Sequence, residues 1–327
     1  MLHTIDISYN QPKLPRCSQW NPYAITFAEK VTLGAYPLGV FVDKSDLVYV
    51  NSEVTKEIHM WNLNSNTSTS IIANNRAFFY SLFVTVREDI YISNSVSSAV
   101  EKWTQNATEG TIVAHGFVCY GLFVDISNHL YCSFYTGNQV VKKSLNDDSS
   151  VGIIVAGNGT AGIASNMLDG PYGMFVTISY DLYVADSWNH RVQLFKPDQL
   201  DGITVAGGIS MPTVKLNRPV AVFFDMDDYL YIVEAGHNRI IRLRSNMFYC
   251  IVGCSAVSGA APHQLNFPVG AAFDTHGNIF VADYLNSRIQ KFILLTNTSS
   301  KSTLWSISFK KSIAVKCNPS LKVARSV

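Results

Sequence analysis

One segment recurs six times along this chain of 327 residues, and its spacing constrains the fold more than any other feature. The copies start 40 to 52 residues apart, at Gly39, Ser81, Gly121, Gly173, Ala221 and Gly270. Each contains two short apolar runs around a small polar turn. In four copies the turn opens with an aspartate, whose carboxylate can accept backbone N–H bonds two residues on: Asp43, Asp125, Asp225 and Asp274. Each copy is therefore predicted to be a β-hairpin.

A third apolar run follows every hairpin, and a fourth follows five of them. The third runs are Ile58–Trp61, Val100–Trp103, Val140–Lys143, Val192–Phe195, Ile240–Leu243 and Ile289–Phe292. The fourth runs are Ser70–Ala73, Thr111–Ala114, Ile153–Ala156, Ile203–Ala206 and Cys250–Gly253. Four antiparallel strands at this spacing, here named a to d, are typical of a propeller blade. We expect an all-β, six-bladed β-propeller with little or no helix.

The sixth blade needs a fourth strand from elsewhere in the chain. Ile25–Ala28 precedes the first hairpin, and Leu304–Phe309 is a second candidate. We expect Ile25–Ala28 to close the ring, because this makes all repeats equivalent and leaves no unpaired edge at the seam. The expected organisation is an N-terminal tail over residues 1–19, the propeller over 20–295, and a basic C-terminal tail over 296–327 that contains at most one extra strand.

In the last three repeats an acidic residue ends the second strand, and an arginine follows five residues later. The pairs are Asp186 with Arg191, Glu234 with Arg239, and Asp283 with Arg288. The first three repeats lack both members, with Ser52, Asn94 and Phe134 in the acidic place and Glu57, Ala99 and Gln139 in the arginine place. We interpret each pair as a bidentate structural ion pair across the b–c turn, because losing one partner would leave a buried charge unmatched. The alternative is a ring of three arginines that reads a ligand.

These motifs resemble the NHL repeat, a family named for its Asn-His-Leu signature. Asn189–Arg191, His237–Arg239 and Asn286–Arg288 stand at the place of the signature. The resemblance covers about residues 20–295 and is specific only in the last three repeats. It implies a six-bladed propeller of the TolB-like superfamily. It also implies one of three functions: a binding platform for protein, an RNA-binding module, or a zinc enzyme like the related peptidyl-hydroxyglycine lyases.

The enzyme hypotheses need convergent ligands, which the sequence does not supply. A zinc lyase requires histidines from separate blades at equivalent inward positions. The eight histidines instead fall in tails, turns, loops and one strand, at His3, His59, His115, His129, His190, His237, His263 and His276. A central calcium, as in sugar-lactone hydrolases, requires carboxylates at the channel mouth, and the acids here fall mostly in turns. We expect no catalytic residue, metal or cofactor.

Protein or peptide binding is the function that we predict, on the face formed by the loops between strand d and the next strand a. Apolar residues in these loops are the candidate partner face: Phe78, Phe79, Phe117, Met167, Leu168, Met211 and Val257. They could equally fill the spaces between blades. RNA binding is disfavoured because the same loops carry only four cations, Lys30, Arg76, Lys215 and Arg218.

Composition leaves the compartment open. The formal net charge is +1, no apolar run is long enough for a membrane-spanning helix, and no signal peptide is visible at the start. We expect a monomer. Cys17 and Cys317 could bridge if the chain ends meet, whereas Cys250 and Cys254 are too far apart along a continuous strand. Four Asn-x-Ser/Thr sequons, at Asn66, Asn106, Asn158 and Asn297, are about the number expected by chance.

Overall fold

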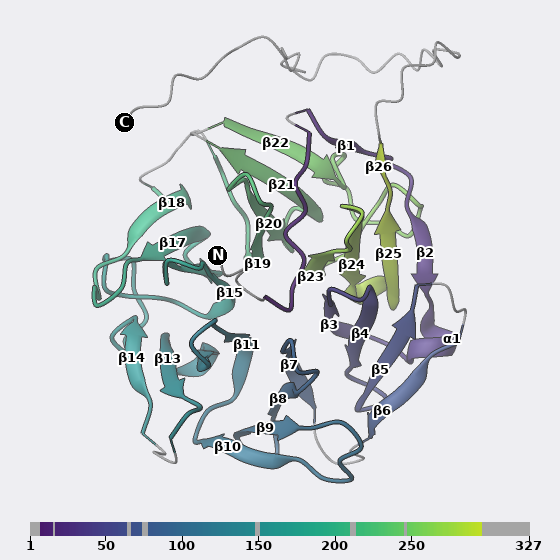
Figure 1. The fold of residues 1–327 in the computed structure, drawn as a ribbon. Helices are drawn as coiled ribbons and strands as arrows, with labels where there is room; N and C mark the ends of the chain where they lie inside the picture. The colour runs from purple at the N-terminus through teal and green to yellow at the C-terminus, as the bar shows by residue number, and fades with distance from the viewer. Residues whose placement is uncertain are drawn as a thin grey trace, which may run out of the picture.

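The computed structural model describes residues 7–15, 17–63, 67–73, 78–147, 151–209, 214–244 and 247–295. Six four-stranded antiparallel sheets stand around a central axis, which confirms the six-bladed β-propeller (Figure 1). Contacts between the first strands of neighbouring blades place these strands innermost. The sequence pattern succeeded because each sheet is covered on both faces by its neighbours, so its strands are apolar on both sides.

The blades repeat one order of strands. Blade 1 contains β3 (Pro37–Val42), β4 (Leu47–Ser52), β5 (Glu57–Asn62) and β6 (Thr69–Ala73). Blade 2 contains β7 (Phe79–Val84), β8 (Ile90–Asn94), β9 (Ala99–Trp103) and β10 (Thr111–His115). Blade 3 contains β11 (Cys119–Val124), β12 (His129–Phe134), β13 (Gln139–Ser144) and β14 (Ile153–Ala156).

Blade 4 contains β15 (Pro171–Val176), β16 (Leu182–Asp186), β17 (Arg191–Phe195) and β18 (Ile203–Gly207). Blade 5 contains β19 (Pro219–Phe224), β20 (Leu230–Glu234), β21 (Arg239–Arg244) and β22 (Met247–Val252). Blade 6 contains β23 (Pro268–Phe273), β24 (Ile279–Asp283), β25 (Arg288–Phe292) and β2 (Ile25–Ala28). Helix in the described residues is limited to α1 (Lys30–Leu33) and two 3-10 turns, Tyr135–Gly137 and Tyr284–Asn286.

The N-terminal strand closes the ring, as predicted. β2 pairs antiparallel with β25, where Ile25 stands opposite Lys291. Thr26 donates a hydrogen bond to Gln290 at 2.9 Å, and the equivalent Thr204 donates to Gln193 in blade 4 at 2.7 Å. β2 therefore occupies the same place as a fourth strand inside the chain. β1 (Gln19–Trp20) extends the seam by pairing with β26 (Leu294–Leu295), and the competing candidate Leu304–Phe309 lies outside the described residues.

The a–b turns confirm the role of the four aspartates. Asp43 Oδ1 accepts the backbone N–H groups of Ser45 and Leu47, both at 2.9 Å. Asp125, Asp225 and Asp274 accept the equivalent pairs of N–H groups in their own turns. A short carboxylate thus fixes the hairpin in four of the six blades.

The cysteines correct one expectation. Cys250 and Cys254 form a disulfide, although a continuous strand would hold them too far apart. The strand ends at Val252, and Gly253 has a φ of +68°, so the chain turns back and the two Cα atoms lie 5.6 Å apart. Cys119 and Cys132 form a second, unpredicted disulfide across β11 and β12. Cys17 is also disulfide-bonded, and Cys317, its expected partner, lies outside the described residues.

The N-terminal segment, residues 7–15 and 17–20, runs from β1 across the blades to the middle of the ring (Figure 1). We call the face with the a–b turns the hairpin face, and the face with the d–a loops and b–c turns the loop face. Tyr9 packs against Phe123 and Phe175 at the hairpin end of the channel, with ring centroids 5.4 and 5.2 Å apart. Beside Tyr9 the channel keeps a cavity of about 130 Å³.

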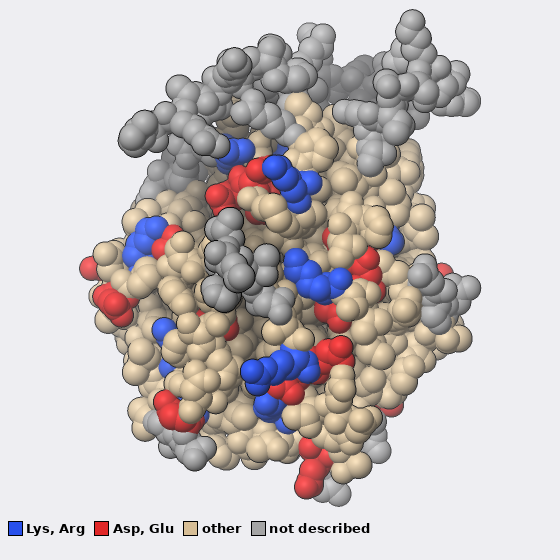
Figure 2. All heavy atoms as spheres, in the orientation of Figure 1, with Lys and Arg blue, Asp and Glu red and all other residues tan. Residues whose placement is uncertain are grey.

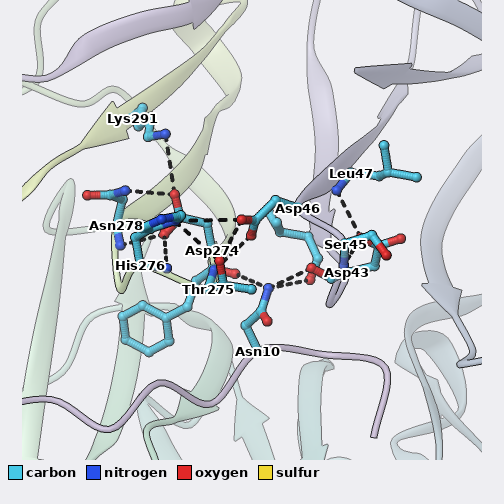
Figure 3. A network of polar contacts seen from close by, with 12 residues as sticks. Asn10, Asp43, Ser45, Asp46, Leu47, Asp274, Thr275, His276, Asn278 and Lys291 are labelled. Atoms are coloured by element: carbon cyan, nitrogen blue, oxygen red, sulfur yellow. Dashed lines mark hydrogen bonds and ion pairs between the residues drawn. The ribbon is translucent and has the colours of Figure 1, made fainter. Parts of the chain in front are cut away.

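Asn10 joins the two blades that meet at the seam. Its amide donates to the Asp43 carbonyl at 2.8 Å and to the Phe273 carbonyl at 3.1 Å, so it links blades 1 and 6 (Figure 3). Asp46 of blade 1 also accepts the backbone N–H of Thr275 in blade 6 at 2.8 Å. The seam is therefore held on the hairpin face as well as by β2. No helix among the described residues is long and apolar enough to cross a membrane.

Candidate functional site

The three acid–arginine pairs form buried ion pairs at the start of strand c. The Nε atom of each arginine lies 2.6 to 2.7 Å from a carboxylate oxygen in the Asp186–Arg191, Glu234–Arg239 and Asp283–Arg288 pairs. All three carboxylates are fully buried. The contact differs from the predicted bidentate fork, because only Nε reaches the carboxylate.

The remaining nitrogens of Arg191 and Arg288 hold the d–a loop that precedes the blade. Arg191 Nη1 donates to the carbonyl of Ile163 at 2.7 Å, and Nη2 donates to the carbonyl of Met167 at 2.8 Å. In blade 6, Arg288 donates in the same way to the carbonyls of Ala260, Ala261 and Gln264. Arg191 and Arg288 therefore bind protein backbone, and this use of their donors leaves little capacity for a ligand.

The acid and the signature asparagine complete this clamp. Asp186 Oδ1 accepts the backbone N–H of Asp169 at 2.7 Å, and Asn189 donates both to Asp186 and to the Gly162 carbonyl at 2.8 Å. Asn286 makes the equivalent pair of bonds in blade 6. Burial raises the pKa of the Asp186 and Asp283 carboxyls, and these hydrogen bonds and the arginines oppose that rise.

The clamp occurs where the d–a loop is long. The loops before blades 4, 5 and 6 span 157–170, 208–218 and 253–267, whereas those before blades 2 and 3 span only 74–78 and 116–118. A short loop can be held without this ion pair, so both members of the pair can be absent. Loop length thus explains why acid and arginine occur together or not at all.

The first three blades satisfy the same positions by other means. Ser52 donates to the Ala35 carbonyl at 3.1 Å, and Asn94 donates to Glu101 at 2.6 Å. Phe134 packs edge-on against Phe117, with ring centroids 5.6 Å apart. The residue before strand c adopts the left-handed conformation in all six blades: Lys56, Ser98, Asn138, His190, Asn238 and Ser287. The b–c turn therefore keeps one geometry without the ion pair.

The described histidines have structural contacts in separate places. His129 lies 3.1 Å from Asp125, His237 lies 2.8 Å from Glu234, and His190 accepts the backbone N–H of Arg218 at 3.1 Å. His59 lies 3.1 Å from Glu57 on strand c of blade 1, and burial lowers the pKa of its ring. Within the described residues, no group of three or more His, Cys, Asp or Glu side chains could hold a metal ion.

A cluster of tyrosines lies at the loop-face end of the channel, and the sequence analysis missed it. We call it the tyrosine mouth, and its members are Tyr36, Tyr80, Tyr120, Tyr135, Tyr172 and Tyr284. Tyr80, Tyr120 and Tyr172 are each the second residue of an innermost strand. The aligned repeats place these three tyrosines at the same position in three consecutive blades. This repetition is the sequence signal that could have identified the cluster.

The tyrosines of the mouth stack on one another and stay partly exposed. The Tyr120 ring lies 4.5 Å from both Tyr80 and Tyr135, and Tyr36 lies 5.1 Å from Tyr284. Burial, together with neighbouring tyrosines, raises the pKa of Tyr120 and Tyr172. These hydroxyls therefore stay neutral and able to donate hydrogen bonds at physiological pH.

Three further side chains border the mouth. Tyr284 donates to Glu53 at 2.6 Å, and the indole of Trp188 donates to the Tyr135 hydroxyl at 2.5 Å. The Arg218 guanidinium lies 4.2 Å above the Trp188 ring. Exposed apolar residues occupy the same b–c turn position in four blades, at Val54, Val96, Trp188 and Leu285. The loop face thus presents aromatic and apolar groups around the channel.

The predicted partner residues do not form one surface. Phe79 and Leu168 are fully buried, so they belong to the core, and their assignment to the partner face is wrong. Phe117 and Met167 are half-buried, whereas Phe78 and Val257 are exposed. Met211 lies outside the described residues. The sequence placed Phe79 in a loop although it begins strand β7, and Leu168, which does lie in a loop, is packed into the hydrophobic core.

Charge does not gather on the hairpin face. Figure 2 shows Lys and Arg side chains next to Asp and Glu on the face that the N-terminal segment crosses, with large areas free of charge between them. Several of the neighbours are ion pairs, such as Lys102 with Asp89 and Lys196 with Asp181, both at 2.7 Å. This face offers no single-sign patch for a polyanion.

The comparisons with known proteins agree with this architecture. Residues 265–292 match the NHL repeat. The mouse protein "NHL repeat-containing protein 3" is 24% identical over 139 residues, which are 38% of this chain and 40% of that protein. The match thus spans about two fifths of the length of that relative.

Solved structures share the fold at low sequence identity. A protein of unknown function from Bacteroides thetaiotaomicron has a TM-score of 0.66 and 13% identity, covering 88% of this chain and 76% of its own. Virginiamycin B lyase from Staphylococcus aureus has a TM-score of 0.59 and 14% identity, covering 85% of this chain and 100% of its own.

Proposed function

We propose that this chain, a six-bladed β-propeller that carries an NHL repeat, is a non-catalytic interaction module that binds a protein or peptide at the tyrosine mouth of its loop face. The observation that carries this proposal is the stack of partly exposed tyrosines on the loop face, in which Tyr120 lies 4.5 Å from both Tyr80 and Tyr135. Tyrosine, tryptophan and arginine are the residues most enriched at the energetic centres of protein interfaces. They combine a large apolar surface with a polar tip.

The two ends of the channel differ in a way that favours the loop face. The hairpin face also exposes apolar turn residues, including Ile126, Ile178 and Met226. Its channel end, however, already contacts Tyr9 and Asn10 of the same chain. On the hairpin face, a partner that inserts a side chain into the channel would have to displace Tyr9 and Asn10. On the loop face, none of the described N-terminal residues competes with it.

The alternatives have less support on this face. RNA binding needs several free cations to follow a phosphate backbone, and Arg218 is stacked on Trp188 while Lys56 lies 5.2 Å from the Phe78 ring. A lyase-like zinc enzyme needs convergent histidines, and His129, His190 and His237 belong to three different blades and contact Asp125, Arg218 and Glu234. Their contacts support structural roles.

The test selects peptides on the purified chain from a phage-displayed random library. Tyr120→Ala and Tyr172→Ala should each weaken the selected peptides by about 10-fold or more, as truncation at an interface centre does. Ile178→Ala, on the hairpin face of the same blade as Tyr172, is the matched control and should leave affinity unchanged. Tyr120→Phe keeps the ring and should keep most of the affinity.

Two outcomes would contradict the proposal. One is a set of peptides that loses affinity with Ile178→Ala and not with the mouth variants. The other is salt-sensitive retention of mixed-sequence single-stranded RNA with no peptide binding, which would favour the RNA-binding alternative. Circular dichroism of each variant separates loss of binding from loss of fold.

A further inference from the structure

All the cysteines that the structure describes are in disulfides. Cys119 pairs with Cys132, Cys250 pairs with Cys254, and Cys17 is disulfide-bonded. Disulfides form and persist in oxidising compartments and are rare in the cytosol. A cytosolic protein of this size would keep most of these thiols reduced.

The position of one bridge shows when it forms. The exposed fraction of Cys119 is 0% and that of Cys132 is 4%, and both lie inside blade 3. A dissolved oxidant cannot reach these sulfurs once the blade is packed. The bridge therefore forms while the chain folds, which requires an oxidising compartment at that time.

Two of the four sequons lie on the described surface. Asn106 is exposed in the turn between β9 and β10 and adopts the left-handed conformation, with Thr108 exposed two residues on. Asn158 is exposed at the start of the loop after β14, and its side-chain oxygen accepts the N–H of Thr160 at 3.0 Å. In both sequons the hydroxyl residue is threonine, and the amide nitrogen of each asparagine donates no hydrogen bond to the described chain.

We propose that Asn106 and Asn158 are sites of N-linked glycosylation, acquired in the same oxidising secretory compartment that forms the disulfides. The number of sequons carries no weight, because chance supplies as many. The proposal rests instead on two independent observations, the oxidised cysteines and the accessibility of both acceptor side chains. It does not depend on the proposed binding function.

Both reactions balance with reagents of that compartment. Each disulfide forms when two thiols lose two protons and two electrons to a disulfide-bearing oxidoreductase. In glycosylation the asparagine amide nitrogen bonds to the anomeric carbon of a lipid-pyrophosphate-linked oligosaccharide. The sugar–phosphate bond breaks, the lipid pyrophosphate leaves, and the amide nitrogen gives one proton to a base of the transferase.

The two sites lie on opposite faces of the propeller. Asn106 lies in a c–d turn on the hairpin face, away from the tyrosine mouth. Asn158 begins the d–a loop after β14, the outermost strand of blade 3, and so lies on the loop face at the outer edge of that blade. The glycosylation test measures gel mobility and the binding test measures peptide affinity, so each proposal can fail without the other.

The test expresses the full chain behind a cleavable secretion leader in cultured animal cells, with Asn66→Gln and Asn297→Gln so that only these two sequons remain. Secreted protein should lose two steps of gel mobility shift with peptide-N-glycosidase. Thr108→Ala should remove one step and Thr160→Ala the other, whereas Thr108→Ser and Thr160→Ser keep the sequons and should keep both steps. A secreted chain whose mobility does not change with the enzyme overturns the glycosylation.

The disulfides are tested on the same material and on a chain without the leader. Secreted protein, unfolded without reductant, should show no maleimide-reactive thiol, and the chain without the leader should aggregate in the cytosol with reactive thiols. A chain without the leader that stays monomeric and folded with its thiols reduced overturns the assignment to an oxidising compartment.

Discussion

Blades 1–3 and blades 4–6 share one backbone and differ in how their loops are held. In blades 4 and 6, long d–a loops are bound by a buried acid, an asparagine and an arginine, as Asp186, Asn189 and Arg191 show. In blade 5 His237 stands in the place of the asparagine, and Glu234 accepts the loop N–H of Asn217. In the first half the loops are shorter, and Ser52, Asn94 and Phe134 take the acidic place.

This difference shows that the acid–arginine pair stabilises the d–a loop and is not needed to form the blade. Both halves keep the same left-handed residue before strand c, at Ser98 as at His190. Both halves also keep fully buried second strands, as in β8 and β20. The first half supplies four of the six mouth tyrosines, Tyr36, Tyr80, Tyr120 and Tyr135, beside its short loops.

The largest effect is expected from breaking one clamp. Arg191→Met leaves the buried Asp186 unpaired and frees the loop carbonyls, so the free energy of unfolding should fall by about 3–5 kcal/mol in denaturant titrations. Lys196→Met, which breaks the exposed Lys196–Asp181 pair, is the control and should cost below about 1 kcal/mol. Equal losses from the two variants would contradict the clamp.

The same variant should have a recognisable pH dependence. Without Arg191, uncompensated burial raises the pKa of Asp186 further above its unfolded value, so the folded state binds a proton that the unfolded state has lost. Stability of the variant should therefore fall as pH rises through the raised pKa. The deficit relative to the parent should be largest near neutral pH and should shrink on acidification toward about pH 4.

A smaller effect is expected from the disulfide of blade 3, which has no ion pair. Replacing Cys119 and Cys132 with alanine opens a loop with a sequence separation of 13 and should cost about 3 kcal/mol. The Cys250–Cys254 bridge has a separation of 4, and its removal should cost about 2 kcal/mol. Unfolding of the two double variants in denaturant compares them. A larger loss in blade 5 than in blade 3 would contradict the dependence on loop length.

The smallest effect is expected from the signature asparagine. Asn286→Ala removes one bond to Asp283 and one to the Gly259 carbonyl, and the cost should be about 1–2 kcal/mol. Asn146→Ala, on an exposed turn of blade 3, is the matched control. If both variants unfold at the same denaturant concentration as the parent, the asparagine does not contribute to the clamp.

The fold could be predicted because its signal is repeated. Apolar runs in Gly39–Val50 and five further copies fix the strand order, and the missing fourth strand of blade 6 identifies Ile25–Ala28 by its lack of a hairpin. The spacing of acid and arginine predicted the ion pairs. It could not predict that the arginines also bind the preceding d–a loop. The arginine donors reach carbonyls 24 to 28 residues earlier in loops whose path no local pattern encodes.

The remaining features depend on contacts between distant blades. The tyrosine mouth joins Tyr284 of blade 6 with Tyr36 of blade 1, and the aligned repeats show equal positions without showing that they converge. The Cys250–Cys254 bridge depends on where a strand ends, which Gly253 decides. The sequence placed Tyr9 in the N-terminal tail, whereas the structure packs it against Phe175 in the channel. A single aromatic residue in a polar segment gives no sequence pattern that would predict this contact.

Hydrogen exchange of the d–a loop before blade 4 tests the central claim most directly. In Arg191→Met, the amides of residues 162–169 should exchange faster than in the parent, while those of β16, β17 and the short loop 116–118 should keep their rates. Unchanged exchange in residues 162–169, or an equal acceleration in all six blades, would show that the arginine stabilises the propeller as a whole and does not hold its loop.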